Sequence, residues 1–460
     1  MSADWLSVLP PIVAIAVVLW KREVILALFL SIFTAELLQQ TLLVSSVPMA
    51  GLFTLERIAS VFQDKDNARI LIFSMMIGAL LAYIRQSGGV SAMVSSIIRR
   101  GIARNPRQAA MLTTGVGAAV FVESNLSVLS AGILSRGIFD RFGLSRAKLA
   151  YIIDSTSAPI CILVLLNAWG AYVLALLGTY ELDQPAAQIL WGTVPLNFYA
   201  LVTLVIVVFS AWTGKYFGPM ARSETLKHED SADNLEVEAT HPSYMLVPLL
   251  VMVGGMIAFM FWTGDGVMAN GSGSRSVLYS VALASLVAYM MMLSSGNFSH
   301  IKLVRIAFEG MGEILPLVTI VLFSLALGAS LKELGTGVFI AGLVGEFLPV
   351  YLIVPMMFLA GSLISFSTGT SWGTFAILIP IGVPLIQTLG LPPSLVLAAI
   401  LGGGIFGDHC SPISDTTAVS AIASGCDLLE HVRTQLPYAL VAGAITLLMY
   451  FMVSLFYLRT

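Results

Sequence analysis

The 460-residue sequence contains little charge, because Asp, Glu, Lys and Arg make up only 11% of it. A soluble domain usually has about 25% charged residues. Hydrophobic residues make up 57% of the chain, and the mean hydropathy is +0.91. This composition predicts an all-α, multi-pass membrane protein surrounded by lipid. We expect no nucleic-acid partner.

Cysteine is also scarce, and the three cysteines, Cys161, Cys410 and Cys426, form no CxxC pair. They therefore give no disulfide framework. No P-loop or kinase-type motif occurs, so ATP-driven transport has no support. No basic region precedes the first apolar run, so we expect a retained first helix rather than a cleaved signal. We expect no cofactor.

Apolar runs of about 20 residues mark membrane spans. We expect ten spans, close to Trp5–Trp20, Val24–Val44, Ile70–Ile84, Ser157–Leu177, Val194–Trp212, Tyr244–Trp262, Ser276–Leu293, Ile314–Leu331, Ser394–Ser424 and Leu436–Leu458.

Two apolar regions, Gln108–Phe142 and Tyr351–Leu389, are too long for one span. A polar group interrupts each, Glu123-Ser124-Asn125 in the first and Thr368 to Gly373 in the second. We interpret each region as two half-spans that meet at a polar tip. Such a segment is a re-entrant hairpin, which enters and leaves the membrane on the same side.

The two halves of the chain look related. Gly88, Ser124 and Gly143-Leu144 match Gly335, Ser371 and Gly390-Leu391 at a constant shift of 335 − 88 = 247 residues. Residues 1–213 and 244–460 are therefore predicted to be two membrane repeats, joined by an acidic cytoplasmic linker at 214–243. Each repeat would hold five spans and one hairpin. Since five is odd, the copies would be inverted, and the basic residues of the loops place both termini outside.

The stretch from Gly402 to Thr417 interrupts a span with two carboxylates, Asp408 and Asp415. Pro412 lacks an N–H group and four glycines weaken helix, so we expect no continuous helix here. Asp154-Ser155-Thr156-Ser157-Ala158-Pro159 is a similar interruption in the first half. Broken helices with exposed backbone ends are how transporters build ion and substrate sites.

A carboxylate at the bilayer centre costs at least about 2.5 kcal/mol, so it needs a reason. We predict that Asp408, Asp415 and Asp154 bind Na⁺ at the midplane, although each could instead cap a helix. Further candidates for ion or substrate binding are Glu123, Ser124, Asn125, Ser155, Thr156, Thr370, Ser371, His409, Ser411 and Thr416. Hydroxyls in membrane helices often satisfy backbone carbonyls, so any single one is a weak candidate.

Two other chemistries are disfavoured. His409 beside Cys410 could suggest a transition-metal site, but no second His or Cys lies at ligand spacing. Asp408, His409 and Ser411 are too close in one short break to reach the geometry of a hydrolytic triad. We therefore do not expect an enzyme.

The motif from Gly407 to Thr417 resembles the signature of the NhaC family of sodium/proton antiporters, and Lys148 to Pro159 resembles its first-half counterpart. The resemblance implies inverted repeats with two re-entrant hairpins, a scaffold domain that is often dimeric, and a transport domain that moves like an elevator. Two positions differ. His409 stands where the family often has Asn, and Glu123-Ser124-Asn125 stands where many relatives have consecutive aspartates.

The expected function is secondary Na⁺/H⁺ antiport by alternating access. A partly buried carboxylate holds either a proton or Na⁺, so competition for one site couples the two gradients. The alternative is a sodium- or proton-coupled transporter of a small organic acid or amino acid. No Lys or Arg lies in the polar core of either motif or at either tip, and Arg136 is the nearest. This favours cations, although helix N-termini could also attract a carboxylate.

Overall fold

The computed structural model describes most of the chain. The described residues are 5–39, 46–89, 92–93, 96, 103–121, 124–165, 167–178, 180, 182–223, 240–267 and 271–457. Within them the regular structure is helical. Much of the predicted linker, 224–239, lies outside the described residues, as does Glu123.

The helices of the first half are α1 (Leu9–Lys21), α2 (Val24–Gln39), α3 (Ser46–Ser60), α4 (Lys65–Gln86), α6 (Pro106–Ala119), α7 (Ser124–Arg141), α8 (Arg146–Ser155), α9 (Ala158–Leu163), α10 (Ala168–Gly178), α11 (Ala186–Thr193) and α12 (Phe198–Thr213). Those of the second half are α13 (Ser243–Thr263), α14 (Gly273–Ser294), α15 (His300–Leu334), α16 (Thr336–Phe347), α17 (Val350–Thr368), α18 (Ser371–Leu389), α19 (Pro393–Cys410), α20 (Asp415–Ser424) and α21 (Leu428–Tyr457).

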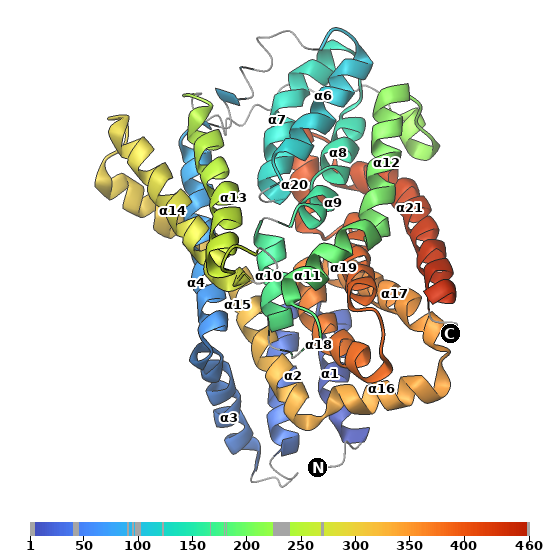
Figure 1. Ribbon diagram of the computed structural model, residues 1–460. Coiled ribbons are helices and arrows are strands. Elements are labelled where there is room, and N and C mark those ends of the chain that lie inside the picture. The colour runs from blue at the N-terminus through green and yellow to red at the C-terminus, as the bar shows by residue number, and fades with distance from the viewer. Residues whose placement is uncertain are drawn as a thin grey trace.

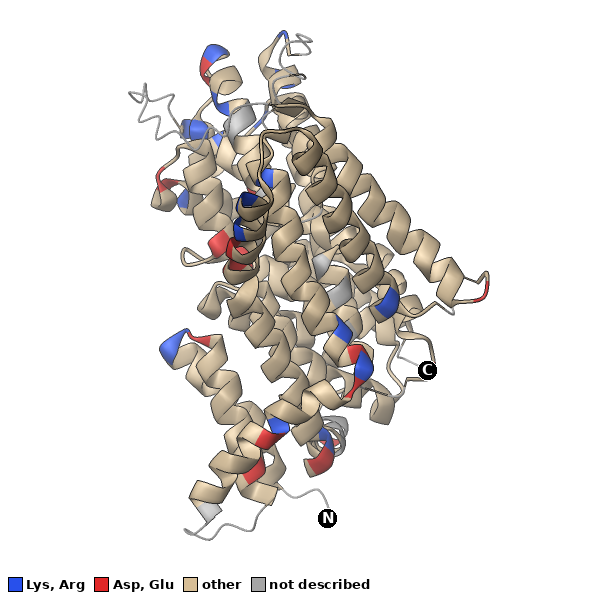
Figure 2. Ribbon diagram, turned by 90° about the vertical axis from the view of Figure 1, so that its left-hand side faces the viewer, with Lys and Arg blue, Asp and Glu red and all other residues tan. Residues whose placement is uncertain are grey.

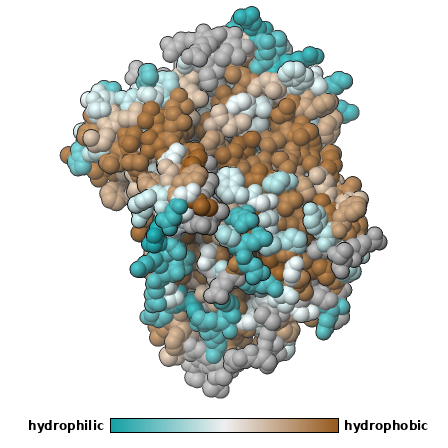
Figure 3. Space-filling view, viewed as in Figure 1, coloured by the Kyte–Doolittle hydropathy of each residue, from teal (hydrophilic) through white to brown (hydrophobic). Residues whose placement is uncertain are grey.

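The chain is a multi-pass membrane protein. Among the described residues, nine helices are long and apolar enough to cross a bilayer. Charged residues lie mainly at helix ends and in the connections, and long stretches of helix carry none (Figure 2). Brown, hydrophobic side chains cover α13 and α14, at the left of Figure 3, where Leu250, Leu286 and Met290 are exposed. Large apolar side chains on the outer surface are expected where lipid is the solvent.

The span predictions need three corrections. The expected span Ser157–Leu177 is two helices, α9 and α10, because the Asn167 side chain bonds the carbonyl of Cys161 and the amides of Trp169 and Gly170 and so replaces helical bonds. The expected span Ile314–Leu331 is only part of the 35-residue helix α15, which continues beyond its apolar run. Helices α3, α11 and α16 were not predicted.

Each of the two long apolar regions contains two helices that meet at the predicted polar tip. In the first region, α6 ends at Ala119 and α7 begins at Ser124. In the second, α17 ends before Gly369, whose φ of +67° suits glycine, and Thr370 caps α18. Figure 1 shows α6 and α7 at the upper end of the molecule and α18 in its lower half, with α19 and α20 between them. The inverted repeat remains a prediction.

The glycines of the 402–417 stretch do not break the helix, contrary to expectation. Helix α19 continues through them to Cys410, and the break is confined to 411–414. Their role is close packing. A Cβ on Gly403 would lie 3.2 Å from Ser362 N of α17, and one on Gly407 would lie 2.6 Å from Phe366 N. Small residues at this spacing allow two membrane helices to approach closely.

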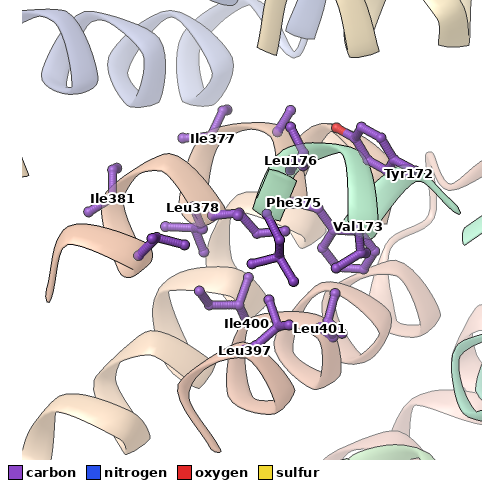
Figure 4. Packing of buried hydrophobic residues seen from close by; sticks show 14 of the residues in the cluster. Tyr172, Val173, Leu176, Phe375, Ile377, Leu378, Ile381, Leu397, Ile400 and Leu401 are labelled. Atoms are coloured by element: carbon purple, nitrogen blue, oxygen red, sulfur yellow. The ribbon is translucent and has the colours of Figure 1, made fainter. Parts of the chain in front are cut away.

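Helix α19 is also held from its other side by a dry apolar core. Tyr172 and Val173 of α10, Phe375 and Leu378 of α18 and Leu401 of α19 belong to one buried cluster (Figure 4). Where lipid is the alternative contact, close van der Waals packing rather than removal of apolar surface from water stabilises such a core. The packing fixes α19 up to the point where its polar end begins.

Candidate functional site

The break between α19 and α20 leaves two helix ends facing each other. Ser411 N still bonds the carbonyl of Asp408 at 3.2 Å, but Pro412 has no N–H to continue the helix. Helix α20 then restarts with Ser414 as its cap, since its Oγ accepts from Thr417 N at 3.3 Å. Ser411 Oγ donates to the carbonyl of Phe366 at 2.8 Å and so ties the break to α17. Unpaired carbonyls and N–H groups are thereby concentrated beside the two carboxylates.

Asp408 is the buried carboxylate of the break, with 1% of its surface exposed. Ser371 Oγ, in the first turn of α18, donates to Asp408 Oδ2 at 3.0 Å. Ser414 also lies within hydrogen-bonding reach of this carboxylate. Because the N-terminal end of a helix attracts negative charge, the start of α18 is a favourable place for Asp408. Its Oδ1 has no hydrogen-bond partner among the described residues.

Asp415 is the accessible carboxylate of the break. Its surface is classed as exposed, although the side chain lies in a crowded part of the protein. Asp415 is the first residue of α20, and its Oδ1 accepts a hydrogen bond from Thr416 N at 2.9 Å. The Asn125 side chain, from the first tip, is within hydrogen-bonding reach of it. Asp408 and Asp415 interact electrostatically, so a cation between them would relieve their repulsion. Asp408 is enclosed by protein, whereas part of the surface of Asp415 is not covered by protein.

Asp154 lies in a second polar cluster, which α21 completes. Its carboxylate, at the end of α8, is 0% exposed. Gln435 Nε2 donates to Asp154 Oδ2 at 2.6 Å, and His431 Nε2 lies 3.4 Å from the same oxygen. His431 and Gln435 are four residues apart and so share one face of α21. Asp154 Oδ1 has no partner in the described part of the chain.

His409 belongs to this second cluster and does not pair with Asp408. Its Nδ1 is 3.1 Å from the Tyr199 hydroxyl of α12, and its ring interacts electrostatically with Asp154. The backbone carbonyl of His409 accepts from Gln435 Nε2 at 3.0 Å. The two broken helices are therefore joined through α21.

Both predicted tips contact broken helices. Ser157 Oγ, between α8 and α9, donates to the carbonyl of Ser124 at 2.7 Å. At the second tip, a Cβ on Gly369 would lie within 3 Å of the backbone of Ile413. In the described residues each tip thus contacts one of the two breaks.

The remaining candidate hydroxyls differ in their hydrogen-bond partners, which are backbone groups for some and polar side chains for others. Thr156 Oγ1 donates to the carbonyl of Ile152 in its own helix, and Thr370 Oγ1 caps α18 by accepting from Gly373 N. Thr416 bonds the Ser414 hydroxyl at 3.0 Å, next to the carboxylates. Ser155 lines a small cavity together with Tyr199 and Gln435. Only Ser371 donates directly to a carboxylate among these side-chain bonds, so it is the best-placed hydroxyl of the set.

The sequence prediction missed His431, Gln435 and Tyr199. The expected last span began at Leu436, which excluded the first two, whereas α21 begins at Leu428. A histidine and a glutamine at i and i+4, directly before a long apolar run, are the signal that could have identified them.

The oxygen atoms around Asp408 and Asp415 suit a hard cation. The hydroxyls of Ser371 and Ser414 lie beside Asp408, and the Asn125 side chain lies beside Asp415. Oxygen ligands of this kind bind ions such as Na⁺ rather than soft metals, which prefer thiolate or imidazole.

Comparison with known proteins agrees with this picture. A family model described as the Na⁺/H⁺ antiporter family matches residues 160–455. An uncharacterized protein of Haemophilus influenzae is 30% identical over 99% of this chain and 92% of its own length. The malate-2H⁺/Na⁺-lactate antiporter of Bacillus subtilis is 39% identical over 26% of this chain and 28% of its own. The Na⁺/H⁺ antiporter NhaC of Alkalihalophilus pseudofirmus is 33% identical over 20% of each chain.

Solved structures show the same fold. The YdaH transporter of Alcanivorax borkumensis, 13% identical, superposes with a TM-score of 0.60 over 90% of both chains. The predicted membership of the NhaC-type sodium/proton antiporters is confirmed by these matches. The chain belongs to the Na⁺/H⁺ antiporter family and is a secondary transporter.

Proposed function

We propose that this protein exchanges Na⁺ for H⁺ at Asp408 and Asp415. The observation that carries the proposal is the pairing of a sealed and an accessible carboxylate across one helix break, with a serine of a hairpin tip bonded to the sealed one. A cation that enters at Asp415 meets Asp408 next. Protons and Na⁺ then compete for the same oxygens, and either ion excludes the other.

Asp154 acts as the partner carboxylate in this proposal. It interacts electrostatically with Asp408 and with Asp415, but its own contacts are with α21. Negative charge at Asp154 therefore raises the attraction of the whole centre for cations without supplying a ligand at the break.

The nearby arginines favour a cation over an anionic cargo. Arg136 donates to the backbone carbonyls of Ala423 and Ile422, and Arg146 donates to that of Gly425 at 3.5 Å. These carbonyls end α20, where positive charge is favourable. Both guanidinium groups thus contribute to capping α20.

A second candidate is exchange that also carries a small organic acid or amino acid. Two relatives favour it by name, the malate-2H⁺/Na⁺-lactate antiporter and an arginine/ornithine antiporter of Halobacterium salinarum. The N-terminal end of α18, beside Asp408, and that of α20, at the break, attract negative charge and need no basic side chain to hold a carboxylate.

The test is transport by purified protein in proteoliposomes. We expect an outward Na⁺ gradient to drive proton uptake, measured with an internal pH dye, with no added organic acid. Parallel vesicles receive labelled malate, lactate or ornithine. Uptake that requires one of these solutes would replace Na⁺/H⁺ exchange with the second candidate. We further expect this activity to need no cofactor. We also expect that the protein lies in a bacterial inner membrane as a homodimer.

A further inference from the structure

Gln435 occupies a position that neither motif explains. It lies on α21, with 1% of its surface exposed, and its Nε2 contacts two groups from different broken helices. These are Asp154 Oδ2 at the end of α8, at 2.6 Å, and the carbonyl of His409 near the end of α19, at 3.0 Å. The two hydrogens of one amide nitrogen thus have one acceptor each.

The orientation of this amide follows from its neighbours. A carboxylate oxygen and a backbone carbonyl only accept hydrogen bonds, so the group that faces them is the NH₂ and not the oxygen. Gln435 Oε1 has no partner among the described residues, and Gln435 lines a small cavity with Tyr151 and Thr203. No protein donor among the described residues therefore draws the amide away from its two acceptors.

The bridge brings together two negative ends. Asp154 carries a carboxylate, and the end of α19 carries the partial negative charge of unpaired carbonyls. Without a donor between them, these groups would repel each other in a buried place where electrostatic interactions are strong. Gln435 replaces that repulsion with two hydrogen bonds.

We propose that Gln435 is a positioning residue that couples Asp154 to the α19–α20 break. This inference rests on the proposed Na⁺/H⁺ exchange, because Gln435 acts by holding the end of α19, and with it Asp408, in the geometry that binds Na⁺. Loss of the bridge lets the α19 end move away from Asp154. The affinity for Na⁺ then falls, while the steps that move the loaded protein are unchanged.

The first experiment measures Na⁺-driven proton movement in proteoliposomes for Gln435→Met, which keeps the length of the side chain but has no donors. We expect the half-saturating Na⁺ concentration to rise by about tenfold, the effect of losing one hydrogen bond to a charged group. The maximal rate should stay within about twofold of wild type. Gln435→Leu, which lacks the amide donors and adds no charge, should give the same direction if Gln435→Met does not fold.

Thr434→Val is the matched control. Thr434 is its neighbour on α21, is equally buried, and bonds only the carbonyls of Glu430 and His431 in its own helix. Equal half-saturating Na⁺ concentrations in the Gln435 and Thr434 variants would overturn the proposal. A lower maximal rate in Gln435→Met, with the half-saturating Na⁺ concentration of wild type, would also overturn it.

A second measurement separates this inference from the exchange function. If the wild-type protein moves no protons in response to Na⁺, the proposed function has failed, and hydrogen exchange of the purified protein then decides the role of Gln435. We expect faster amide exchange at 405–414 in Gln435→Met than in Thr434→Val. Equal exchange in the two variants would mean that the bridge does not hold the end of α19.

Discussion

Asp408 and His409 are adjacent in the chain, but their side chains contact different parts of the molecule. Asp408 accepts from Ser371 of α18, whereas His409 contacts Tyr199 of α12. Successive residues of a helix point about 100° apart, so neighbouring side chains of α19 reach different neighbouring helices. The break thus presents its carboxylate to the hairpin tip and its imidazole to the cluster around Asp154.

The carboxylates of the break should be indispensable for exchange. We expect Asp408→Asn and Asp415→Asn each to abolish Na⁺-driven proton movement, since an amide cannot exchange a proton for a cation at that position. Both variants should still insert and elute as folded protein in size-exclusion chromatography. Exchange at the wild-type rate in either variant would make that residue purely structural.

Ser371→Ala removes the hydroxyl that donates to Asp408. We expect a rise of about tenfold in the half-saturating Na⁺ concentration, as for the loss of one hydrogen bond to a charged group. Ser367→Ala is the control, because Ser367 is half-buried and its one hydrogen bond among the described residues goes to the carbonyl of Leu363 in its own helix. If the two variants have the same Na⁺ dependence in transport assays, Ser371 is not part of the ion site.

Gly407→Ala tests the packing of α19 against α17. Alanine is intrinsically better than glycine in a helix by about 1 kcal/mol. Here its Cβ would lie 2.6 Å from Phe366 N, and overpacking of this kind costs about 1–3 kcal/mol. We therefore expect a lower melting temperature in detergent. Gly312→Ala, with no atom within 4 Å of the added Cβ, should be unchanged or slightly stabilised, and the opposite order would refute close packing as the role of Gly407.

The sequence identified the polar interruption correctly but misjudged which residues cause it. Pro412 breaks the helix as predicted, whereas Gly402, Gly403 and Gly404 remain helical because the neighbouring helices fill the space that their missing side chains leave. Helix propensity could not reveal this, since packing overrides it. The separate neighbours of Asp408 and His409 were equally hidden, because a sequence does not give the partner on each face of a helix.

The lengths of the apolar runs also gave wrong helix bounds where polar side chains end or extend helices. Asn167 divides one apolar run into α9 and α10 through local bonds, and α21 extends eight residues before its predicted start to include His431 and Gln435. The Asn167 side chain replaces helical hydrogen bonds with local ones. The Gln435 side chain has a partner, Asp154, that is distant in the sequence. Apolar run length alone cannot detect either case.

Membrane topology can be tested with single cysteines in a protein whose three native cysteines are replaced. Arg141 ends α7 and Thr388 is close to the end of α18, and both are exposed. The predicted inverted repeat places Arg141 on the cytoplasmic side and Thr388 outside. A membrane-impermeant maleimide added to intact cells should therefore label Thr388→Cys only. Labelling of both or of neither from outside would contradict the inverted orientation of the hairpins.

The last prediction concerns competition between Na⁺ and H⁺. If both ions use the oxygens of Asp408 and Asp415, a bound proton must leave before Na⁺ binds, so acid weakens apparent Na⁺ affinity. In radioactive Na⁺ binding to purified protein, the half-saturating concentration should be constant at high pH. It should then rise towards a limit of about tenfold per pH unit as the pH falls below the titration of the site.

Thr434→Val should reproduce this pH dependence, since the Thr434 hydroxyl bonds carbonyls of its own helix. Sites that bind the two ions independently would instead give one half-saturating Na⁺ concentration at every pH. That result would show that the proton and Na⁺ bind at different sites. Asp154 would then be the candidate proton site, because it is a buried carboxylate that Gln435 connects to the end of α19.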